Sequence, residues 1–308
     1  MTIASHLRKF EPILGYLRPA YRRIRTNYLR WRYPTGGFVT ATGIPVYADF
    51  DLATYAWYDA DLPNLAFDKR IITTLVKQSS GSVFVDIGAH FGYYSALFAE
   101  LTRCREDGAK IIAVEPDLAN FKCLERTIAP YKHVVAVLLQ AAATDVDGQT
   151  MLFRSSGASC LHSFGETAAE IYSVPSIRLD TVTTKYVDAD ERIALVKVDI
   201  DGAEATFLRG AVETFAAHRP IIFIEFSPAN LFTAGVDARQ FLDDLCSRFI
   251  VYSVAYSTRT IRRVAATDYA QIKSEMDSLG SAITDLIASP FPLDLSALNA
   301  ESTGSSPR

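Results

Sequence analysis

The chain has 308 residues, of which 49% are hydrophobic and 21% charged, and a formal net charge of -4. This composition is typical of a globular protein, and the length suits one large α/β domain with additions or two small domains. No apolar run reaches the roughly 20 residues of a membrane helix, charges interrupt every candidate signal-peptide core, and the four cysteines form no C-x-x-C pair, so we expect a reduced, cytoplasmic protein.

Positive charge is concentrated at the start of the chain. Residues 1–32 contain eight Lys or Arg and one acid, a net charge of +7, which leaves -11 for the remainder. Arginines alternate with aromatic and aliphatic side chains over 16–33, a pattern that suits peripheral contact with a membrane or a protein. The alternative that we favour is a basic helix packed on the domain. We predict a basic helical segment over 1–35 and, because the remainder is acidic, no nucleic-acid partner.

Three stretches precede the central motif. Residues 38–50 alternate loosely around Thr42-Gly43, which predicts a β-hairpin. Residues 49–64 are rich in acids and aromatics and form either a loop over the active site or a packing segment. Residues 65–78 carry apolar side chains at helical spacing, so we expect a helix that leads directly into the next strand.

The central motif is a buried strand that turns through glycines into a helix. The strand is predicted over Val83–Ile87 and the helix over 93–101, with Gly88 and Gly92 between them. Glycines allow the backbone to approach a ligand, and the helix N-terminus offers unpaired N–H groups. His90 replaces the middle glycine of a dinucleotide loop, and Asp86 would repel a diphosphate but suits the ammonium and sulfonium groups of S-adenosylmethionine. The alternative is an ordinary strand-to-helix turn.

The next strand also ends in an acid. Residues 110–114 read as a short buried strand, and Glu115 follows it. A carboxylate at this position can accept hydrogen bonds from both hydroxyls of a ribose. Glu115-Pro116-Asp117 is, alternatively, a good helix start. A crossover helix is expected over 118–128.

A third apolar run, 134–139, leads to small residues at Ala141–Ala143 that would leave room for a flat ring. Asp145 either holds an adenine amino group or only begins the following turn. A further strand is predicted over 150–153. Residues 155–167 form a small-residue loop, in which His162 is a weak candidate for substrate contact.

A second motif gathers carboxylates after a buried strand. The strand covers 194–198 and contains Lys197, and Asp199, Asp201 and Glu204 follow it. Ligands in open α/β sheets lie outside the carboxyl ends of the strands. Acids so close together repel one another, so they need a cation: Lys197, a sulfonium or a divalent metal. The helix 203–216 comes next, and Glu225 lies near the end of the strand predicted over 220–226.

The C-terminal part of the chain predicts the antiparallel end of a mixed sheet. We expect a helix over 237–249, a strand over 250–255 and its hairpin partner over 260–264. Residues 269–288 are amphipathic and interrupted at Gly280. The tail over 291–308, polar from Asn299 onward, is expected to be disordered.

These motifs resemble the FkbM family of methyltransferases, which use S-adenosylmethionine. The resemblance covers roughly residues 65–228, and its motifs appear in the family's order. The family commonly has Asn where His90 stands and Glu where Asp201 stands, so substrate details are expected to differ. The matching stretches are 85–95, 114–116, 142–145 with Gly148, 177–180, 196–204 and 224–225.

The resemblance implies a Rossmann-like class I methyltransferase domain over 36–290, with a mostly parallel seven-stranded sheet, an antiparallel end and helices on both faces. It also implies methyl transfer to a hydroxyl of a sugar, glycan or natural-product-like molecule. Asp199 would be the base, Glu225 the second and His90 the third candidate, and Lys197 would orient the carboxylates. The cofactor would be held by Asp86, Gly88, Ala89, His90, Gly92, Tyr94, Glu115, Pro116, Ala142, Asp145 and Asp199.

Three alternatives stay open. We expect no metal, but Asp199, Asp201 and Glu204 would be its ligands if one is used. The chain could be a non-catalytic adenosyl-binding module that recruits a partner through its basic N-terminus. It could also be a nucleotide-sugar or nicotinamide enzyme, although His90 in place of a glycine disfavours that reading. The oligomeric state cannot be read from the residues.

Overall fold

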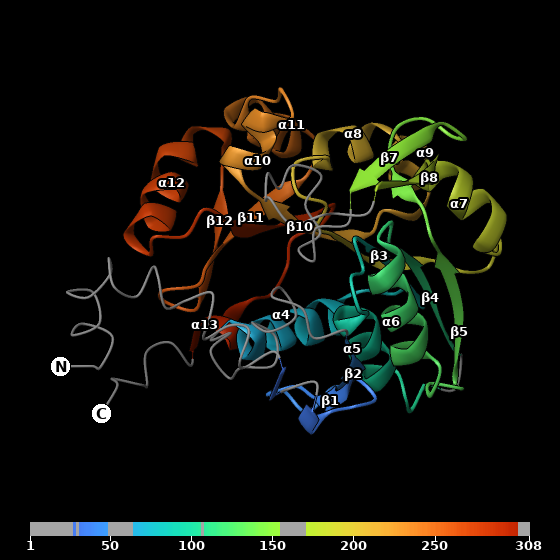
Figure 1. Cartoon of the computed structure of the whole chain (residues 1–308). Coiled ribbons are helices and arrows are strands. Elements are labelled where there is room, and N and C mark those ends of the chain that lie inside the picture. Colours follow the sequence, from blue (N-terminus) through green and yellow to red (C-terminus); the bar gives the residue numbers. More distant parts are fainter. Residues whose placement is uncertain (1–26, 29–30, 49–63, 106–107, 155–170, 301–308) are drawn as a thin grey trace.

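A computed structural model describes residues 27–28, 31–48, 64–105, 108–154 and 171–300 (Figure 1). Most of the basic segment 1–35, the stretch 49–63 and the loop 155–167 with His162 lie outside the described residues. No helix in the described part of the chain is long and apolar enough to cross a membrane.

The centre of the structure is an eight-stranded mixed sheet with the order β12-β11-β13-β10-β9-β3-β4-β5 (Figure 1). The strands from β10 through β9, β3 and β4 to β5 are parallel, whereas β13 runs antiparallel to both of its neighbours. The strands are β3 (Val83–Ile87), β4 (Ala109–Val114), β5 (Val134–Leu139), β9 (Ile193–Val198), β10 (Ile221–Phe226), β11 (Ile250–Ala255), β12 (Thr260–Val264) and β13 (Thr284–Ser289).

The sheet has one strand more than the seven that we expected. The amphipathic stretch 269–288 is a helix only as far as α12 (Tyr269–Ser278). Gly280 follows with a φ of 62°, a left-handed conformation that favours glycine and ends the helix. Residues 284–289 form β13, which is inserted between β10 and β11. The amphipathic pattern interrupted at Gly280 did not reveal this strand, because a fully buried strand and a buried helix share the same apolar composition.

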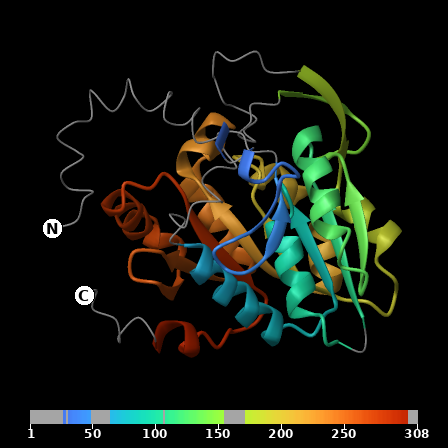
Figure 2. The ribbon, with the colours of Figure 1, turned by 60° about the horizontal axis from the view of Figure 1, so that its bottom comes forward.

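Helices cover both faces of the sheet and enclose two apolar cores (Figures 1 and 2). One core lies against α4 (Leu65–Gln78), α5 (Tyr93–Leu101) and α6 (Leu118–Ile128), whose bounds match the prediction. The opposite core lies against α12 and against α7 (Leu179–Tyr186), α8 (Glu204–Arg209), α9 (Val212–His218), α10 (Pro228–Thr233) and α11 (Ala238–Arg248). The helix predicted over 203–216 is thus two helices, separated at Gly210-Ala211.

Two smaller sheets flank the main one. The predicted hairpin is present as β1 (Gly37–Val39) and β2 (Pro45–Tyr47), and Phe38 and Val46 join the core on the α4 side. Its β2 strand is tied to α6 by a 2.8 Å hydrogen bond from the Tyr47 amide to Thr127 Oγ1. Strands β6 (Ala142–Ala143), β7 (Thr150–Arg154) and β8 (Ile171–Ile177) form the second small sheet.

The C-terminal tail is ordered farther than we expected. Residues 296–300 form α13 (Ser296–Ala300), and Leu295 and Leu298 are buried in the core on the α4 side. The Asn299 side chain donates to and accepts from the backbone of Ile261 at 3.0 and 2.9 Å. The prediction of disorder from residue 291 is therefore wrong for 291–300, because two apolar side chains outweigh the polar composition. Residues 301–308 lie outside the described part.

Candidate functional site

Strand register places four ionisable side chains on one face of the sheet, near its carboxyl edge. Asp86 on β3 is the register partner of Lys197 on β9, and Glu225 on β10 is the partner of Asp285 on β13. Lys197 also pairs with Phe223, two residues before Glu225. Partners in register point to the same face, and side chains two apart on a strand do so as well. All four therefore face the layer formed by α4 and α5.

Lys197 is the buried cation of this group. Its Nζ donates a 2.8 Å hydrogen bond to Asp199 Oδ2 and lies 4.6 Å from the ring centroid of Tyr94 on α5. Burial alone would lower the pKa of Lys197, but the nearby carboxylates of Asp199 and Asp86 outweigh it and raise the pKa. The ammonium group therefore stays charged and fixes one oxygen of Asp199, whose side chain remains 41% exposed.

Sequence reasoning missed three residues of the site: Asp68, Tyr256 and Asp285. Tyr256 follows β11, and its hydroxyl, which has a single proton to donate, lies 2.8 Å from Asp68 Oδ1 and within hydrogen-bond distance of Asp285 Oδ2. Tyr94 donates to Asp68 Oδ2 at 3.2 Å. The only sequence feature that pointed to any of the three is Asp68, an acid on the apolar side of the helix 65–78. Asp285 was missed because the sequence pattern did not reveal β13, and Tyr256 because nothing in the sequence marks it.

Carboxylates outnumber cations in this cluster. Burial raises the pKa of Asp68 to about 6 and of Asp285 to about 7. Burial also raises the pKa of Asp86 above its ordinary value and that of Glu225 well above. Asp86 Oδ1 and Glu225 Oε2 have no hydrogen-bond partner among the described residues. Among the described residues the cluster therefore has more carboxyl groups than cations, and protonation of some carboxyls or a cationic ligand would relieve the repulsion.

The glycine loop has the predicted path, but its glycines serve chain packing. A β-carbon on Gly88 would lie 1.8 Å from the carbonyl oxygen of Asp199, and one on Gly92 would lie 2.7 Å from Leu124 Cδ1. Both residues have positive φ, as does His90 at 52°. The missing β-carbons are therefore required where the end of β9 approaches Gly88 and α6 approaches Gly92, and contact of these glycines with a ligand stays a prediction.

The Glu115 carboxylate binds the backbone of this loop. Its Oε2 accepts the amide of His90 at 2.8 Å, and its Oε1 accepts the amide of Asp117 at 2.9 Å. Asp117, and not Glu115, caps α6 by accepting the amides of Ala119 and Asn120. Burial raises the pKa of Glu115 to about 8, although the two backbone donors lower it. Glu115 is thus next to the loop but poorly hydrated, as a ribose-binding acid would be.

Three further predicted cofactor residues follow the ends of β4 and β5: Pro116, Ala142 and Asp145. Ala142 is buried in β6, and the Pro116 carbonyl accepts from the Gln140 side chain at 3.5 Å. Asp145 Oδ2 accepts from Arg209 Nε at 2.9 Å, so its carboxylate is held by α8. Contact of these three residues with an adenine remains a prediction.

The three carboxylates considered for a metal face different partners. Asp199 pairs with Lys197, whereas Asp201 Oδ1 accepts from the Asn230 side chain at 3.5 Å. Glu204 Oε1 accepts the amides of Gly202 and Ile200 at 3.1 and 3.3 Å, and burial raises its pKa to about 7. Within the described ranges, no three His, Cys, Asp or Glu side chains are gathered as a metal site.

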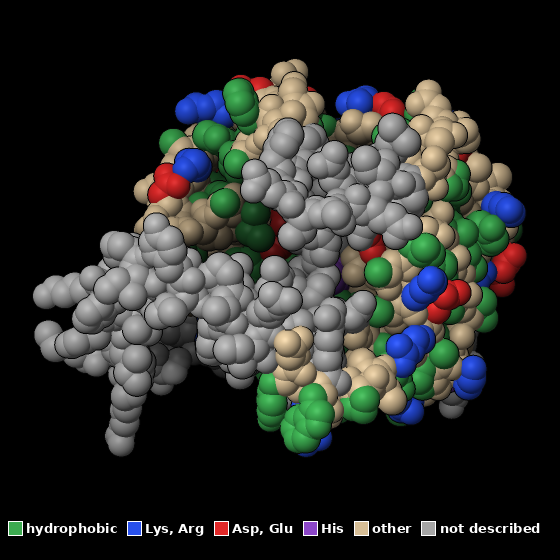
Figure 3. Space-filling view, in the orientation of Figure 1, with side chains coloured by type: hydrophobic (Ala, Val, Ile, Leu, Met, Phe, Trp, Pro, Cys, Tyr) green, Lys and Arg blue, Asp and Glu red, His purple; other side chains and the backbone are tan. Residues whose placement is uncertain are grey.

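A small cavity brings many of the predicted residues together. Figure 3 shows acidic side chains (red) and a histidine (purple) in the recesses of this face of the molecule. Phe91 and Tyr93 complete a lining that otherwise consists of predicted site residues. The lining comprises Gly88, Ala89, His90, Phe91, Tyr93, Tyr94, Lys197 and Asp199.

Three solved structures to which this chain is similar are distant from it in sequence. Methyltransferase FkbM from Methylobacillus flagellatus KT is 17% identical with a TM-score of 0.41, and the alignment covers 68% of this chain but only 43% of that one. The O-methyltransferase TomG from Streptomyces achromogenes is 12% identical with a TM-score of 0.42, covering 77% and 86%. An O-methyltransferase from Bacillus cereus is 12% identical with a TM-score of 0.39, covering 72% and 80%.

A comparison with curated proteins gives no match. The family described as "Methyltransferase FkbM domain" matches residues 86–249, from the acid before the glycine loop to the end of α11. This match contains Asp86, Glu115, Lys197, Asp199 and Glu225 and spans more than half of the chain. The chain therefore belongs to the FkbM methyltransferase family and is an S-adenosylmethionine-dependent methyltransferase.

Proposed function

We propose that the chain transfers a methyl group from S-adenosylmethionine to a hydroxyl of a sugar, a glycan or a natural-product-like small molecule. The observation that carries the proposal is the excess of buried carboxylates over cations at the carboxyl edge, directly beside the glycine loop. A sulfonium supplies positive charge, which favours the ionised form of carboxyl groups that outnumber the cations among the described residues.

The residues of the glycine loop and Glu115 fit the cofactor. When bound, S-adenosylmethionine supplies an electrophilic methyl group on sulfur. Glu115 lies against the loop through the His90 amide, and a carboxylate at this position is suited to accept hydrogen bonds from ribose hydroxyls. Asp86, with one oxygen free of partners among the described residues, would face positive charge.

Asp199 is the best placed proton acceptor. An acceptor hydroxyl loses its proton to a base as its oxygen bonds to the methyl carbon and the sulfur leaves. Lys197 holds one oxygen of Asp199, and the side chain is partly exposed at the cavity. Glu225 is only 8% exposed, and burial raises its pKa well above the ordinary value, so it is less readily ionised and is the second candidate.

The test replaces the two carboxylates separately. Asp199→Asn should lower kcat by about 100-fold or more, the range of general-base catalysis, while the Kd of S-adenosylhomocysteine changes less than about threefold. Glu225→Gln should lower kcat less. Asp188→Asn, which removes an exposed carboxylate that pairs with Lys110 elsewhere, is the matched control and should leave both unchanged.

The measurements are calorimetry with S-adenosylhomocysteine and a labelled-methyl assay against extracted glycans, lipids and small metabolites. Full turnover by Asp199→Asn would remove Asp199 from the base role. Tight S-adenosylhomocysteine binding with no methyl transfer to any acceptor would favour the non-catalytic adenosyl-binding module instead. A lack of binding would refute the proposed cofactor site.

A further inference from the structure

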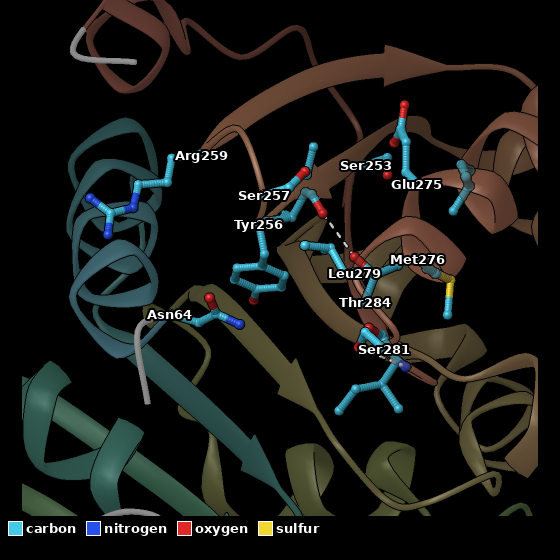
Figure 4. Close-up of a pocket in the computed structure, with 14 residues that line it drawn as sticks. Asn64, Ser253, Tyr256, Ser257, Arg259, Glu275, Met276, Leu279, Ser281 and Thr284 are labelled. Carbon is cyan, nitrogen blue, oxygen red and sulfur yellow. Dashed lines mark hydrogen bonds between the residues drawn. The ribbon is translucent and has the colours of Figure 1, made fainter. Parts of the chain in front are cut away.

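Two carboxyl groups that are far apart in the sequence, those of Asp68 on α4 and Asp285 on β13, meet at one hydroxyl. The hydroxyl of Tyr256 lies 2.8 Å from Asp68 Oδ1 and within hydrogen-bond distance of Asp285 Oδ2. The Tyr256 ring packs edge-on against Phe67 of α4, with ring centroids 6.2 Å apart, and forms part of the wall of a cavity of about 400 Å³ (Figure 4). Packing of the ring thus holds the hydroxyl between the two carboxyl groups.

Hydrogen-bond accounting limits the charge of this pair. A tyrosine hydroxyl donates one hydrogen bond, whereas an ionised carboxylate only accepts. If Asp68 and Asp285 were both ionised, Tyr256 could donate to one of them, and its oxygen lone pairs would face a negative oxygen of the other. Both contacts are hydrogen bonds only if one carboxyl group is protonated and donates to Tyr256. The geometry therefore favours at least one proton on the pair.

Asp68 is the better placed of the two to be ionised. Tyr94 donates to Asp68 Oδ2 at 3.2 Å, so each oxygen of Asp68 contacts a hydroxyl, whereas Asp285 makes one such contact within the described part of the chain. Asp285 is also the register partner of Glu225, a second acid that disfavours its ionised form. The pKa values, which burial raises to about 6 for Asp68 and about 7 for Asp285, have the same order.

Other ionisable groups face the pair from α5 and from the neighbouring strands. Lys197 is the cation among them, and its positive charge partly offsets the effect of burial on the pKa of both Asp68 and Asp285. Asp86 faces the same cation from β3. The remaining groups are Tyr93, Tyr94, Asp199, Glu225 and Tyr256. With one cation among so many acids, a proton on Asp285 lowers the repulsion within the cluster.

A chain of contacts leads from Asp68 to the transfer site. Asp68 accepts from the Tyr94 hydroxyl, the Tyr94 ring lies 4.6 Å from Lys197 Nζ, and Lys197 donates to Asp199 at 2.8 Å. A hydrogen bond to a charged acceptor is stronger than one to a neutral acceptor. An ionised Asp68 therefore fixes the ring against which Lys197 lies, and with it the direction of the bond from Lys197 to Asp199.

We propose that ionised Asp68 is a positioning residue for methyl transfer, which acts on Asp199 through Tyr94 and Lys197, and that Asp285 holds the proton of the pair. The inference rests on the proposed function, because it takes Asp199 as the base. It adds residues beyond the family match over 86–249, since Asp68 and Asp285 both lie outside that range.

The first test replaces each carboxyl group by an amide of the same size. Asp68→Asn removes the charge that holds Tyr94, so kcat should fall by about tenfold while the Kd of S-adenosylhomocysteine changes less than about threefold. Asp285→Asn is the matched variant: it keeps a neutral side chain whose amide can donate to Tyr256, so it should lower kcat less than Asp68→Asn does.

Tyr94→Phe tests the route from Asp68 to Lys197 independently of Asp68→Asn. It keeps the ring beside Lys197 and removes the hydroxyl, so kcat should again fall. Because both changes break the same contact, the double variant should turn over no more slowly than Asp68→Asn alone. Purely additive effects of the two changes would contradict a common route. Melting temperatures of all variants separate a loss of folded protein from a loss of turnover.

Nuclear magnetic resonance of protein labelled with ¹³C at the aspartate carboxyl groups locates the proton without turnover. At a pH between the two pKa values, Asp285→Asn should remove the signal of a protonated carboxyl group and leave the signals of the ionised ones. The proposal is overturned if Asp285→Asn instead removes the signal of an ionised group, or if it lowers kcat as much as Asp68→Asn. A wild type that binds no S-adenosylhomocysteine would speak against the proposed function, while the resonance measurement would still decide the position of the proton.

Discussion

One ammonium group, that of Lys197, is buried among carboxylates from four parts of the chain. Asp86 comes from β3, Asp68 from α4, Asp285 from β13, and Asp199 follows β9. Burying so many acids near one cation is unfavourable unless some are protonated or a further cation binds. Negative charge that Lys197 does not compensate can therefore attract a cationic ligand. Such a cluster is typical of functional sites and not of stabilising ion pairs.

At this scale the cofactor should bind with a pH dependence set by Glu115. Because burial raises its pKa to about 8, Glu115 is mostly neutral at pH 7. Ribose hydroxyls donate to a carboxylate and so favour its ionised form, which means that binding releases a proton. The affinity for S-adenosylhomocysteine should rise roughly tenfold between pH 7 and pH 9 and then level off.

Calorimetry in buffers of different ionisation enthalpy measures this proton release directly. Glu115→Gln should bind more weakly and with a nearly flat profile between pH 7 and pH 9. An affinity of the wild type that is constant over this range would show that Glu115 does not meet the ribose.

The sequence was sufficient to predict where residues lie when their position follows from a local pattern. Asp86, Gly88, Glu115 and Lys197 could be placed because each lies at a strand end with a recognisable apolar run before it. Asp68, Tyr256 and Asp285 could not, since they come together only through tertiary packing of α4, β11 and β13. Asp145 shows the intermediate case: its position was foreseen, but its ion pair with Arg209 depends on where α8 lies.

At the scale of elements, the β3–α5 loop can lie against the end of β9 only because Gly88 has no side chain. The Gly88→Ala β-carbon would meet the Asp199 carbonyl at 1.8 Å, in a backbone conformation with φ of 76°. We expect a loss of stability of roughly 2–4 kcal/mol, since the strain of positive φ and the steric overlap add together. Asp199 should move as well, so turnover should fall more than stability alone explains.

Gly108→Ala is the matched control, because Gly108 has the same φ of 76° but no atom within 4 Å of the added β-carbon. This substitution should lower the free energy of unfolding by about 1 kcal/mol, from backbone strain alone. Urea unfolding of both variants measures the difference. Equal losses would mean that the loop can move away from β9 without penalty.

At the scale of the whole molecule, the C-terminal tail closes the α4 side of the sheet. Leu295 and Leu298 are buried, Asn299 bonds the backbone of β12, and the Gln78 side chain bonds the backbone of Asp294 at 2.6 and 2.8 Å. Removing residues 291–308 should therefore lower the free energy of unfolding by roughly 3–6 kcal/mol, mostly through the two leucines.

The control is a truncation after residue 300, which keeps every one of these contacts. Thermal and urea unfolding of the two truncations give the comparison. If both are equally stable, the packing of 291–300 contributes nothing and the polar composition of the tail was the better guide.

The position of β13 has a consequence for how the enzyme is made. This strand is the last of the sheet in the chain, yet it lies between β10 and β11. While the nascent chain leaves the ribosome, the parallel strands can join as they emerge, but the β11–β12 hairpin has no place in the sheet until residues 284–289 arrive. The parallel strands that carry the glycine loop, Glu115 and Lys197 can thus come together first, and Asp285 completes the carboxylate cluster only after β13 has been made.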